Sequence, residues 1–239
     1  APVNLPLDIA YEDDDIIVIN KPFDMPAHPS AGNHDNTLAN ALMYYYGSQN
    51  KPFVYRCINR LDRDTTGLTI VAKHALAGGI LGNAVAKRAI HRTYYAVCSG
   101  CTPACMRISA PIARKDASTI ERCVDFKRGE NAVTDFIRIK YNPDNNLSLV
   151  KLRLLTGRTH QIRAQMAHAG WPLLGDGKYG RERFNKDFGE NGQALYSYRL
   201  RFEFPTDAGA LEYLRGKEFR VERVDFAEKY FGVTELDFE

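Results

Sequence analysis

The order of apolar and polar residues along the chain predicts several short buried strands. The run Ile16-Ile17-Val18-Ile19 is continuously apolar, as in a strand buried on both faces, and an acidic turn over residues 12–15 precedes it. Pro22 should end this strand, because proline has no N–H group to donate to a sheet. The same pattern predicts further strands at residues 68–72, 94–97, 134–141, 147–155 and 195–204. The fourth and fifth of these six strands flank the turn 142–146, which is typical of an antiparallel hairpin.

Apolar residues at helical spacing predict three helices. The first follows a capping residue at Asn36 or Thr37 and should stop at Gly47. The second covers about 76–89, although two adjacent glycines weaken its first turn. The third should cover about 159–169, with a glycine at its end. Many strands with few helices between them indicate an α+β fold with a mixed, largely antiparallel sheet and flanking helices.

Length and composition agree with an ordinary globular protein. The chain has 239 residues, of which 44% are hydrophobic and 26% charged. One domain spanning residues 1–239 is the simplest description. We expect a soluble, cytoplasmic protein without membrane contact, because no apolar run reaches the roughly 18 residues of a membrane helix and no secretory signal is visible at the N-terminus.

Five cysteines make an odd count, which does not fit a disulfide framework. Cys98, Cys101 and Cys105 form a C-x2-C-x3-C cluster that suggests a metal. A structural zinc site takes four ligands, and no obvious fourth lies nearby in sequence. Reduced structural thiols are therefore favoured, with a metal or cluster as the alternative.

The charge is unevenly distributed. Residues 203–239 contain ten acidic and five basic residues, a net charge of −5, whereas residues 1–202 contain 27 basic and 19 acidic residues, a net charge of +8. A basic body with an acidic C-terminal segment suits a protein that presents one face to an anionic polymer. A solvated surface with uneven charge would give the same counts.

Two stretches concentrate reactive side chains. Residues 59–68, Asn-Arg-Leu-Asp-Arg-Asp-Thr-Thr-Gly-Leu, form a charged loop directly before a predicted strand. Residues 155–163, Leu-Thr-Gly-Arg-Thr-His-Gln-Ile-Arg, pass from a strand into a helix whose first turn offers N–H groups to an anion. Without further information each stretch could equally be a charged turn or a surface helix.

Together these stretches resemble the signature motifs of RluA-type pseudouridine synthases, R-L-D-x-x-T-[ST]-G-L and L-x-T-G-R-x-H-Q-I-R. Residues 11–29 are similar to the opening segment of that family, Arg92-Thr93-Tyr94-Tyr95-Ala96 to its basic-x-Tyr-x-Ala strand, and Gly175-Asp176 with Tyr179 to the segment after the second motif. The resemblance covers residues 11–204, with the motifs in the same order, and leaves 205–239 as an acidic C-terminal segment.

The resemblance implies the pseudouridine synthase fold, a mixed sheet with a central basic cleft. It implies an enzyme that isomerises selected uridines of structured RNA, ribosomal or transfer RNA, to pseudouridine, with no cofactor and no metal. Carried over by position, Asp62 is the catalytic nucleophile, Tyr94 the active-site tyrosine that stacks on the flipped uracil, and Arg163 the basic partner of Asp62.

RNA contacts are expected from five further residues. Arg60 matches a residue that displaces the target base, and Asn59, Arg92, Arg158 and His160 are candidate RNA contacts. Asn59 departs from the family, which usually has histidine there, so altered RNA contacts are expected. Only about ten residues precede the first motif, so the small N-terminal S4 domain of many relatives is expected to be absent. Target choice would then depend on loops at residues 98–105 and 181–193, and we expect a monomer that needs no protein partner.

Two alternatives are open. Asp62-Arg63-Asp64 could be the D-x-D metal site of a transferase or nuclease, which loses activity in EDTA, but that reading explains none of the later motifs. A noncatalytic RNA-binding protein on the same fold is the other alternative. It does not explain why Asp62, Tyr94 and Arg163 are all retained.

Overall fold

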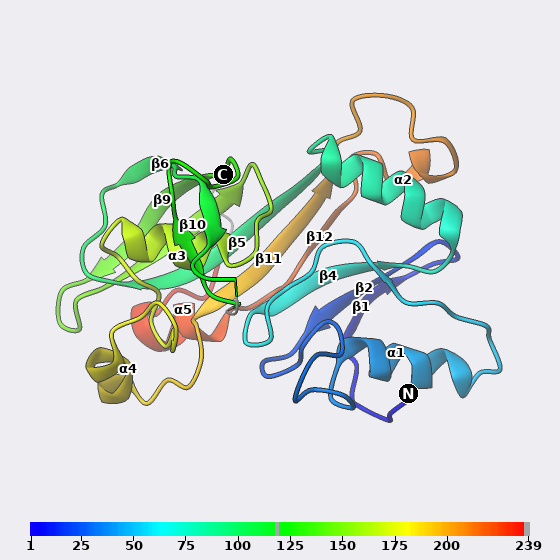
Figure 1. Ribbon diagram of the computed structural model, residues 1–239, viewed down its shortest axis with the longest axis horizontal. Coiled ribbons are helices and arrows are strands. Elements are labelled where there is room, and N and C mark those ends of the chain that lie inside the picture. The colour runs from blue at the N-terminus through cyan, green and yellow to red at the C-terminus, as the bar shows by residue number, and fades with distance from the viewer. Residues whose placement is uncertain (118–119, 237–239) are drawn as a thin grey trace. The chain divides into compact units, whose positions relative to one another are not determined.

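A computed structural model describes residues 1–117 and 120–236 and divides the chain into two compact units. The first unit contains residues 1–91 and 197–221, and the second contains residues 92–196 and those from 222 onward. The chain passes from one unit to the other within strands β5 (Ile90–Ser99) and β11 (Leu195–Phe202). Figure 1 gives the element labels used below.

The first unit is built on a sheet with neighbour order β1-β2-β4-β11, with β3 paired to β4 and β12 to β11. Its further strands are β1 (Ile9–Glu12), β2 (Ile16–Lys21), β3 (Arg56–Cys57), β4 (Thr66–Ala72) and β12 (Glu218–Arg220). Its helices are α1 (Leu38–Gly47), α2 (Ala75–Ala86) and the 3-10 helix η1 (Gly209–Leu214). The strand pairs β1·β2, β2·β4, β3·β4 and β11·β12 are antiparallel.

Strand β2 is buried on both faces, as its continuous apolar run predicts. Ile17 and Ile19 pack with the apolar side chains of α1 in one cluster. Ile16 and Val18 point the other way, into a cluster with α2 and η1. All four are fully buried, so the sheet is covered by α1 on one face and by α2 on the other (Figure 1).

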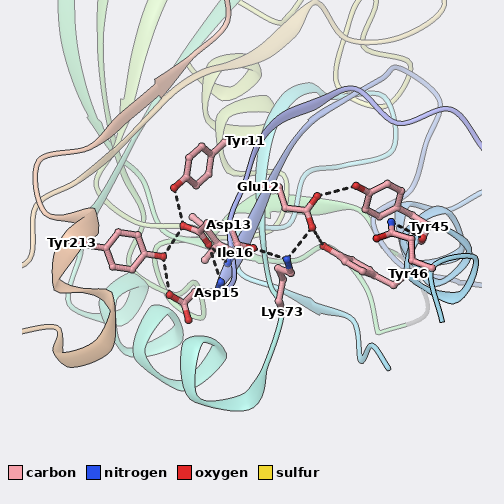
Figure 2. Close-up of polar contacts among 10 residues, drawn as sticks. Tyr11, Glu12, Asp13, Asp15, Ile16, Tyr45, Tyr46, Lys73 and Tyr213 are labelled. Atoms are coloured by element: carbon pink, nitrogen blue, oxygen red, sulfur yellow. Dashed lines mark hydrogen bonds and ion pairs between the residues drawn. The ribbon is translucent and has the colours of Figure 1, made fainter. Parts of the chain in front are cut away.

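The acidic turn between β1 and β2 anchors the surrounding elements through two carboxylates (Figure 2). Glu12 accepts hydrogen bonds of 2.9 Å each from Tyr45, Tyr46 and Lys73. Asp13 accepts hydrogen bonds from the Tyr11 and Tyr213 hydroxyls at 2.8 and 2.6 Å. Burial alone would raise the pKa of both carboxyls, but these donors outweigh it and lower the pKa. The turn thereby ties α1, the end of β4 and η1 to the first two strands.

The second unit contains a sheet with neighbour order β5-β10-β9-β6 and a separate two-stranded sheet, β7-β8. Its further strands are β6 (Cys105–Ser109), β7 (Ile112–Arg114), β8 (Arg122–Val124), β9 (Val133–Asn142) and β10 (Leu147–Leu154). Its helices are α3 (Gln161–His168), α4 (Glu182–Phe188) and α5 (Asp225–Phe231). The pairs β5·β10, β9·β10, β6·β9 and β7·β8 are antiparallel, so the predicted α+β class with a largely antiparallel sheet is confirmed.

Several predicted elements are confirmed, with shifted ends. The 134–141 and 147–155 hairpin is present as β9 and β10. Thr37, one of the two predicted caps, forms a capping box with Asn40 at the start of α1. Helix α2 stops at Ala86, three residues before the predicted end, because Arg88 takes a left-handed conformation with φ 59°. The segment 181–193, predicted to be a loop, contains α4, so that prediction is wrong.

The cysteines differ in exposure. Cys98 is buried in β5, whereas Cys101 and Cys105 are exposed, and all five cysteine thiols are free. Within 1–117 and 120–236, no group of three or more His, Cys, Asp or Glu side chains is placed to hold a metal ion. Across the same residues, every helix is too short or too polar to cross a membrane.

Candidate functional site

Asp62 lies in the first unit, in the loop between β3 and β4. The loop turns at this point: the Thr65 N–H donates to the Asp62 carbonyl at 3.2 Å, and the Asp62 side chain is half-buried. The next residue, Arg63, is exposed and forms an ion pair with Asp64 at 2.8 Å. The loop therefore contains two partly buried carboxylates, Asp62 and Asp64, with Asp64 paired to Arg63.

Lys21, at the end of β2, holds this loop through hydrogen bonds. Its side chain is 1% exposed, and its Nζ donates to the carbonyl oxygens of Pro22 and Arg63, at 2.8 Å each. Burial lowers the pKa of Lys21 to about 7, against the opposing effect of the nearby carboxylates, among them Asp62. Lys21 was not among the residues predicted for the site, because it lies at the end of a predicted strand. Lys21 lies between Asn20 and Pro22, outside the apolar run 16–19, so the local pattern gives no sign of its burial.

Asn59 also holds the loop, through both ends of its side-chain amide. Its Nδ2 donates to the Leu68 carbonyl at 3.1 Å, and its Oδ1 accepts from the Ile70 N–H at 2.7 Å. The side chain therefore pairs with β4 as a neighbouring strand would, and it is only 4% exposed. This burial argues against the predicted RNA contact of Asn59, whereas Arg60 and Arg63 of the same loop are exposed.

Gly67 allows the loop to enter β4 close to β11. Its φ is +108°, and a Cβ atom there would lie 2.3 Å from the Ser197 carbonyl oxygen. Both the conformation and the contact exclude other residues. The Ser197 hydroxyl adds a hydrogen bond of 3.0 Å to the Leu68 carbonyl. The glycine of the first motif is thus explained by packing.

Tyr94 and Arg163 lie in the second unit. Tyr94 is on β5, opposite Leu152 of β10, and is 5% exposed. Arg163 is on α3 and is also 5% exposed. Its guanidinium forms a two-pronged ion pair with Asp176: Nε lies 2.7 Å from Oδ2, and Nη2 lies 2.9 Å from Oδ1.

Asp176 is a further site residue, seen in the sequence only as part of a matching Gly-Asp pair. Its side chain is fully buried and also accepts the backbone N–H groups of Lys178 and Tyr179 at 2.9 and 3.1 Å. Burial raises the pKa of the Asp176 carboxyl, but Arg163 and the two N–H groups outweigh this and lower it. An ionised Asp176 therefore fixes the guanidinium of Arg163 through two of its three nitrogens. The predicted pairing of Arg163 with Asp62 stays a prediction.

His160 and Arg163 both contact Tyr179. His160 precedes α3 in a left-handed conformation with φ 54°, so the helix begins at Gln161, later than predicted. The His160 Nδ1 lies 2.8 Å from the Tyr179 hydroxyl, and the Arg163 guanidinium carbon lies 5.2 Å from the centre of the Tyr179 ring. His160 and Arg163 thus share Tyr179 as an aromatic partner.

Gln161 organises the loop before α3. Its Oε1 accepts from the Thr156 hydroxyl at 2.7 Å and from the Arg158 N–H at 3.0 Å, while its Nε2 donates to the Val133 carbonyl at 3.1 Å. The glycine between these residues, Gly157, leaves room for the Arg92 guanidinium, which lies 2.8 Å from where a Cβ would be. Arg158 itself is exposed and forms an ion pair with an acidic neighbour. Arg92 and Arg158 thus flank one loop.

Comparison with known proteins agrees with the two motifs. The family model described as RNA pseudouridylate synthase matches residues 15–168. A relative named ribosomal large subunit pseudouridine synthase D from Haemophilus ducreyi is 42% identical over 222 residues, which are 88% of this chain and 67% of that protein. The protein of the same name from Haemophilus influenzae is 43% identical over 220 residues, with the same coverage of both chains.

Solved structures show the same fold. Human RNA Pseudouridylate Synthase Domain Containing 1 matches with a TM-score of 0.70 at 24% identity, over 97% of each chain. Human RNA Pseudouridylate Synthase Domain Containing 4 matches with a TM-score of 0.67 at 21% identity, over 90% of this chain and 87% of that one.

Proposed function

Since the chain belongs to the RNA pseudouridylate synthase family, and is thus an RNA pseudouridine synthase, we propose that its substrate is large-subunit ribosomal RNA. The relatives that are 42–43% identical carry that RNA in their names. We also propose that residues 1–239 act as one catalytic domain and as a monomer, in the cytoplasm where ribosomal RNA is found. No protein partner, metal or cofactor enters the proposal.

The reaction is an isomerisation in which nothing is added or lost overall. The C1′–N1 bond of the uridine breaks, the uracil turns, C5 bonds to C1′, and the proton on C5 is replaced by one on N1. We propose that the Asp62 carboxylate is the nucleophile that holds the fragment during this exchange. Support comes from its half-buried position in a loop that Lys21 and Asn59 fasten to the sheet, which fits a group that must be aimed.

Tyr94 and Arg163 complete the proposed catalytic set. The ring of Tyr94 would stack on the flipped uracil, and its hydroxyl would carry a proton between C5 and N1 or solvent. Arg163 would keep Asp62 ionised, and its rigid pairing with Asp176 supports this use, because a fixed cation does not have to reorganise during the reaction. Arg60 would take the place of the flipped base in the RNA, and Arg92, Arg158 and His160 would contact the RNA backbone.

The observation that carries this proposal is the ordered pair of motifs on a matching fold, one around Asp62 and one around Arg163. The experiment is to incubate the purified protein with in vitro transcribed bacterial large-subunit ribosomal RNA, which contains no pseudouridine, and to map the product by carbodiimide labelling of pseudouridine followed by primer extension, because the isomerisation leaves the mass of the RNA unchanged. We expect pseudouridine at a small number of positions, with and without EDTA. Modification of transfer RNA transcripts alone, with ribosomal RNA untouched, would overturn the substrate, and loss of activity in EDTA would overturn the metal-free reaction.

A further inference from the structure

The second unit contains a basic pocket that the proposed catalytic set does not use. Its volume is about 430 Å³, and it lies where the β7–β8 sheet, the segment around residue 130 and the loop 157–159 meet. Its charged lining consists of Arg114, Arg122, Arg128 and Arg158 with one carboxylate, Glu130, which gives a net charge of +3. Two of these arginines have a carboxylate partner, Arg128 with Asp125 at 2.7 Å and Arg158 with Glu130, and the guanidinium groups around the hollow still repel one another unless an anion joins them.

The arrangement of Arg114 and Arg122 makes this repulsion explicit. They are directly opposite each other on the antiparallel strands β7 and β8. Like charges at opposite positions destabilise a strand pair, so a pair of arginines there is costly in the absence of a ligand. Among the residues that the structure describes, Arg114 forms no ion pair.

The direction of these two side chains is fixed by the core. Ile112 and Val124 are opposite each other two residues away on the same strands, and therefore on the same face as the arginines. Both pack in a cluster with Ala164 of α3. The apolar end of this face is buried against the helix, and the exposed Arg114 and the half-buried Arg122 line the pocket at the other end of the same face.

The Glu130 carboxylate occupies a position in the pocket that a phosphate group could take. The Glu130 side chain is 69% exposed and forms an ion pair with Arg158, with Oε2 2.5 Å from Nη1. Exposed pairs of this kind contribute little stability, so a phosphate could displace Glu130 readily. Arg158 would stay in position, because its Nε also donates to the Asn131 carbonyl at 3.1 Å.

We propose that this pocket binds phosphate groups of the RNA backbone, adding Arg114, Arg122 and Arg128 to the RNA contacts; this rests on the proposed function. The planar guanidinium fork matches phosphate oxygens in a two-pronged contact. None of the described lining residues is aromatic, and stacking platforms are the usual means of holding a base. The pocket therefore fits the backbone and not a flipped nucleotide.

The test measures the binding of a fluorescein-labelled RNA stem–loop with uridines in its loop, by anisotropy over a series of salt concentrations. Arg114→Gln and Arg122→Gln, separately and together, should weaken binding. Log affinity falls as log salt rises, and each arginine removed should make this slope shallower by about 1. Glu130→Gln should have the opposite effect and tighten binding, because it removes the competing carboxylate. This variant also keeps the test valid if an arginine variant folds poorly.

Arg107→Gln is the matched control, because it removes one exposed arginine of the same unit that pairs with Asp135 outside the pocket. A salt slope that falls equally for Arg107→Gln and Arg114→Gln, or binding unchanged in both Arg122→Gln and Glu130→Gln, would overturn the pocket. Turnover on ribosomal RNA separates the two proposals. If the wild type turns over ribosomal RNA but the arginine variants keep its salt slope, the pocket proposal alone is refuted. If the wild type shows no turnover but the variants change the slope as expected, the proposed function is refuted and the pocket proposal stands.

Discussion

The buried pair of Arg163 and Asp176 gives the sharpest stability prediction. Asp176→Asn keeps the size of the side chain but removes its charge, so the Arg163 guanidinium would stay buried with its main counter-charge gone. The native pair has two short contacts, 2.7 and 2.9 Å, and side chains that are 7% and 0% exposed. The Lys178 and Tyr179 N–H groups would also lose an anionic acceptor.

The expected cost follows from this burial. Removing one partner of a buried ion pair typically destabilises a protein by about 3–5 kcal/mol, because the remaining charge is uncompensated. The matched control is Asp135→Asn. Asp135 makes the same two-pronged contact with Arg107, at 2.6 and 2.8 Å, but there the side chains are 63% and 32% exposed. That loss should be below about 1 kcal/mol.

Urea unfolding at pH 7 measures both variants. The difference between wild type and Asp176→Asn should also depend on pH. The native pKa of Asp176 lies below its ordinary value. The contribution of the ionised carboxylate to folding stability is therefore complete above the pKa of the unfolded state and is lost as the pH falls through the native pKa. The difference should therefore shrink below about pH 4. Equal losses for the two variants, or a difference that does not change with pH, would refute this reasoning.

Two other sites give predictions from the same structure. Burial lowers the pKa of Lys21 from 10.5 to about 7, so the unfolded chain binds more protons between these pH values, and wild-type stability should rise with pH from 7 towards 10. Lys21→Met should lack this rise when urea unfolding is measured at pH 7 and 9. An identical rise in both proteins would mean that a group other than Lys21 causes it. Gly67→Ala places a Cβ 2.3 Å from the Ser197 carbonyl oxygen at φ +108° and should destabilise the protein by more than about 3 kcal/mol or prevent folding. Gly79→Ala lies in a helix, with no atom within 4 Å of its new Cβ, and should stabilise the protein by about 0.5–1 kcal/mol. Equal thermal midpoints for these two glycine variants would contradict the packing explanation.

Local signals in the sequence predicted the elements that local interactions determine. Thr37 caps α1 through a residue three positions away, and the β9–β10 hairpin follows from two apolar runs around a short turn. The resemblance to one family is confirmed by the match over residues 15–168. The roles given to Asp62, Tyr94 and Arg163 are proposals on that basis.

The parts that were not predicted depend on contacts between distant residues. Nothing local indicates that Lys21 reaches the Arg63 carbonyl 42 residues away, or that the two ends of the Asn59 amide pair with β4. The left-handed His160 is equally hidden, because histidine carries no strong preference for that conformation, and it moved the start of α3 to Gln161. The opposition of Arg114 and Arg122 depends on strand register, which two strands of three residues do not reveal by periodicity.

The most direct measurement of the central claim is tritium release from RNA whose uridines carry tritium at C5, because pseudouridine formation breaks that C5–H bond. Asp62→Asn has nearly the shape of the wild type but lacks the nucleophilic carboxylate. We predict that the wild type releases tritium from large-subunit ribosomal RNA, and that Asp62→Asn releases none while binding the same RNA with an affinity within about twofold of wild type. Sustained release by an Asp62→Asn protein shown by mass spectrometry to be undeamidated would contradict the assignment of Asp62 as the nucleophile.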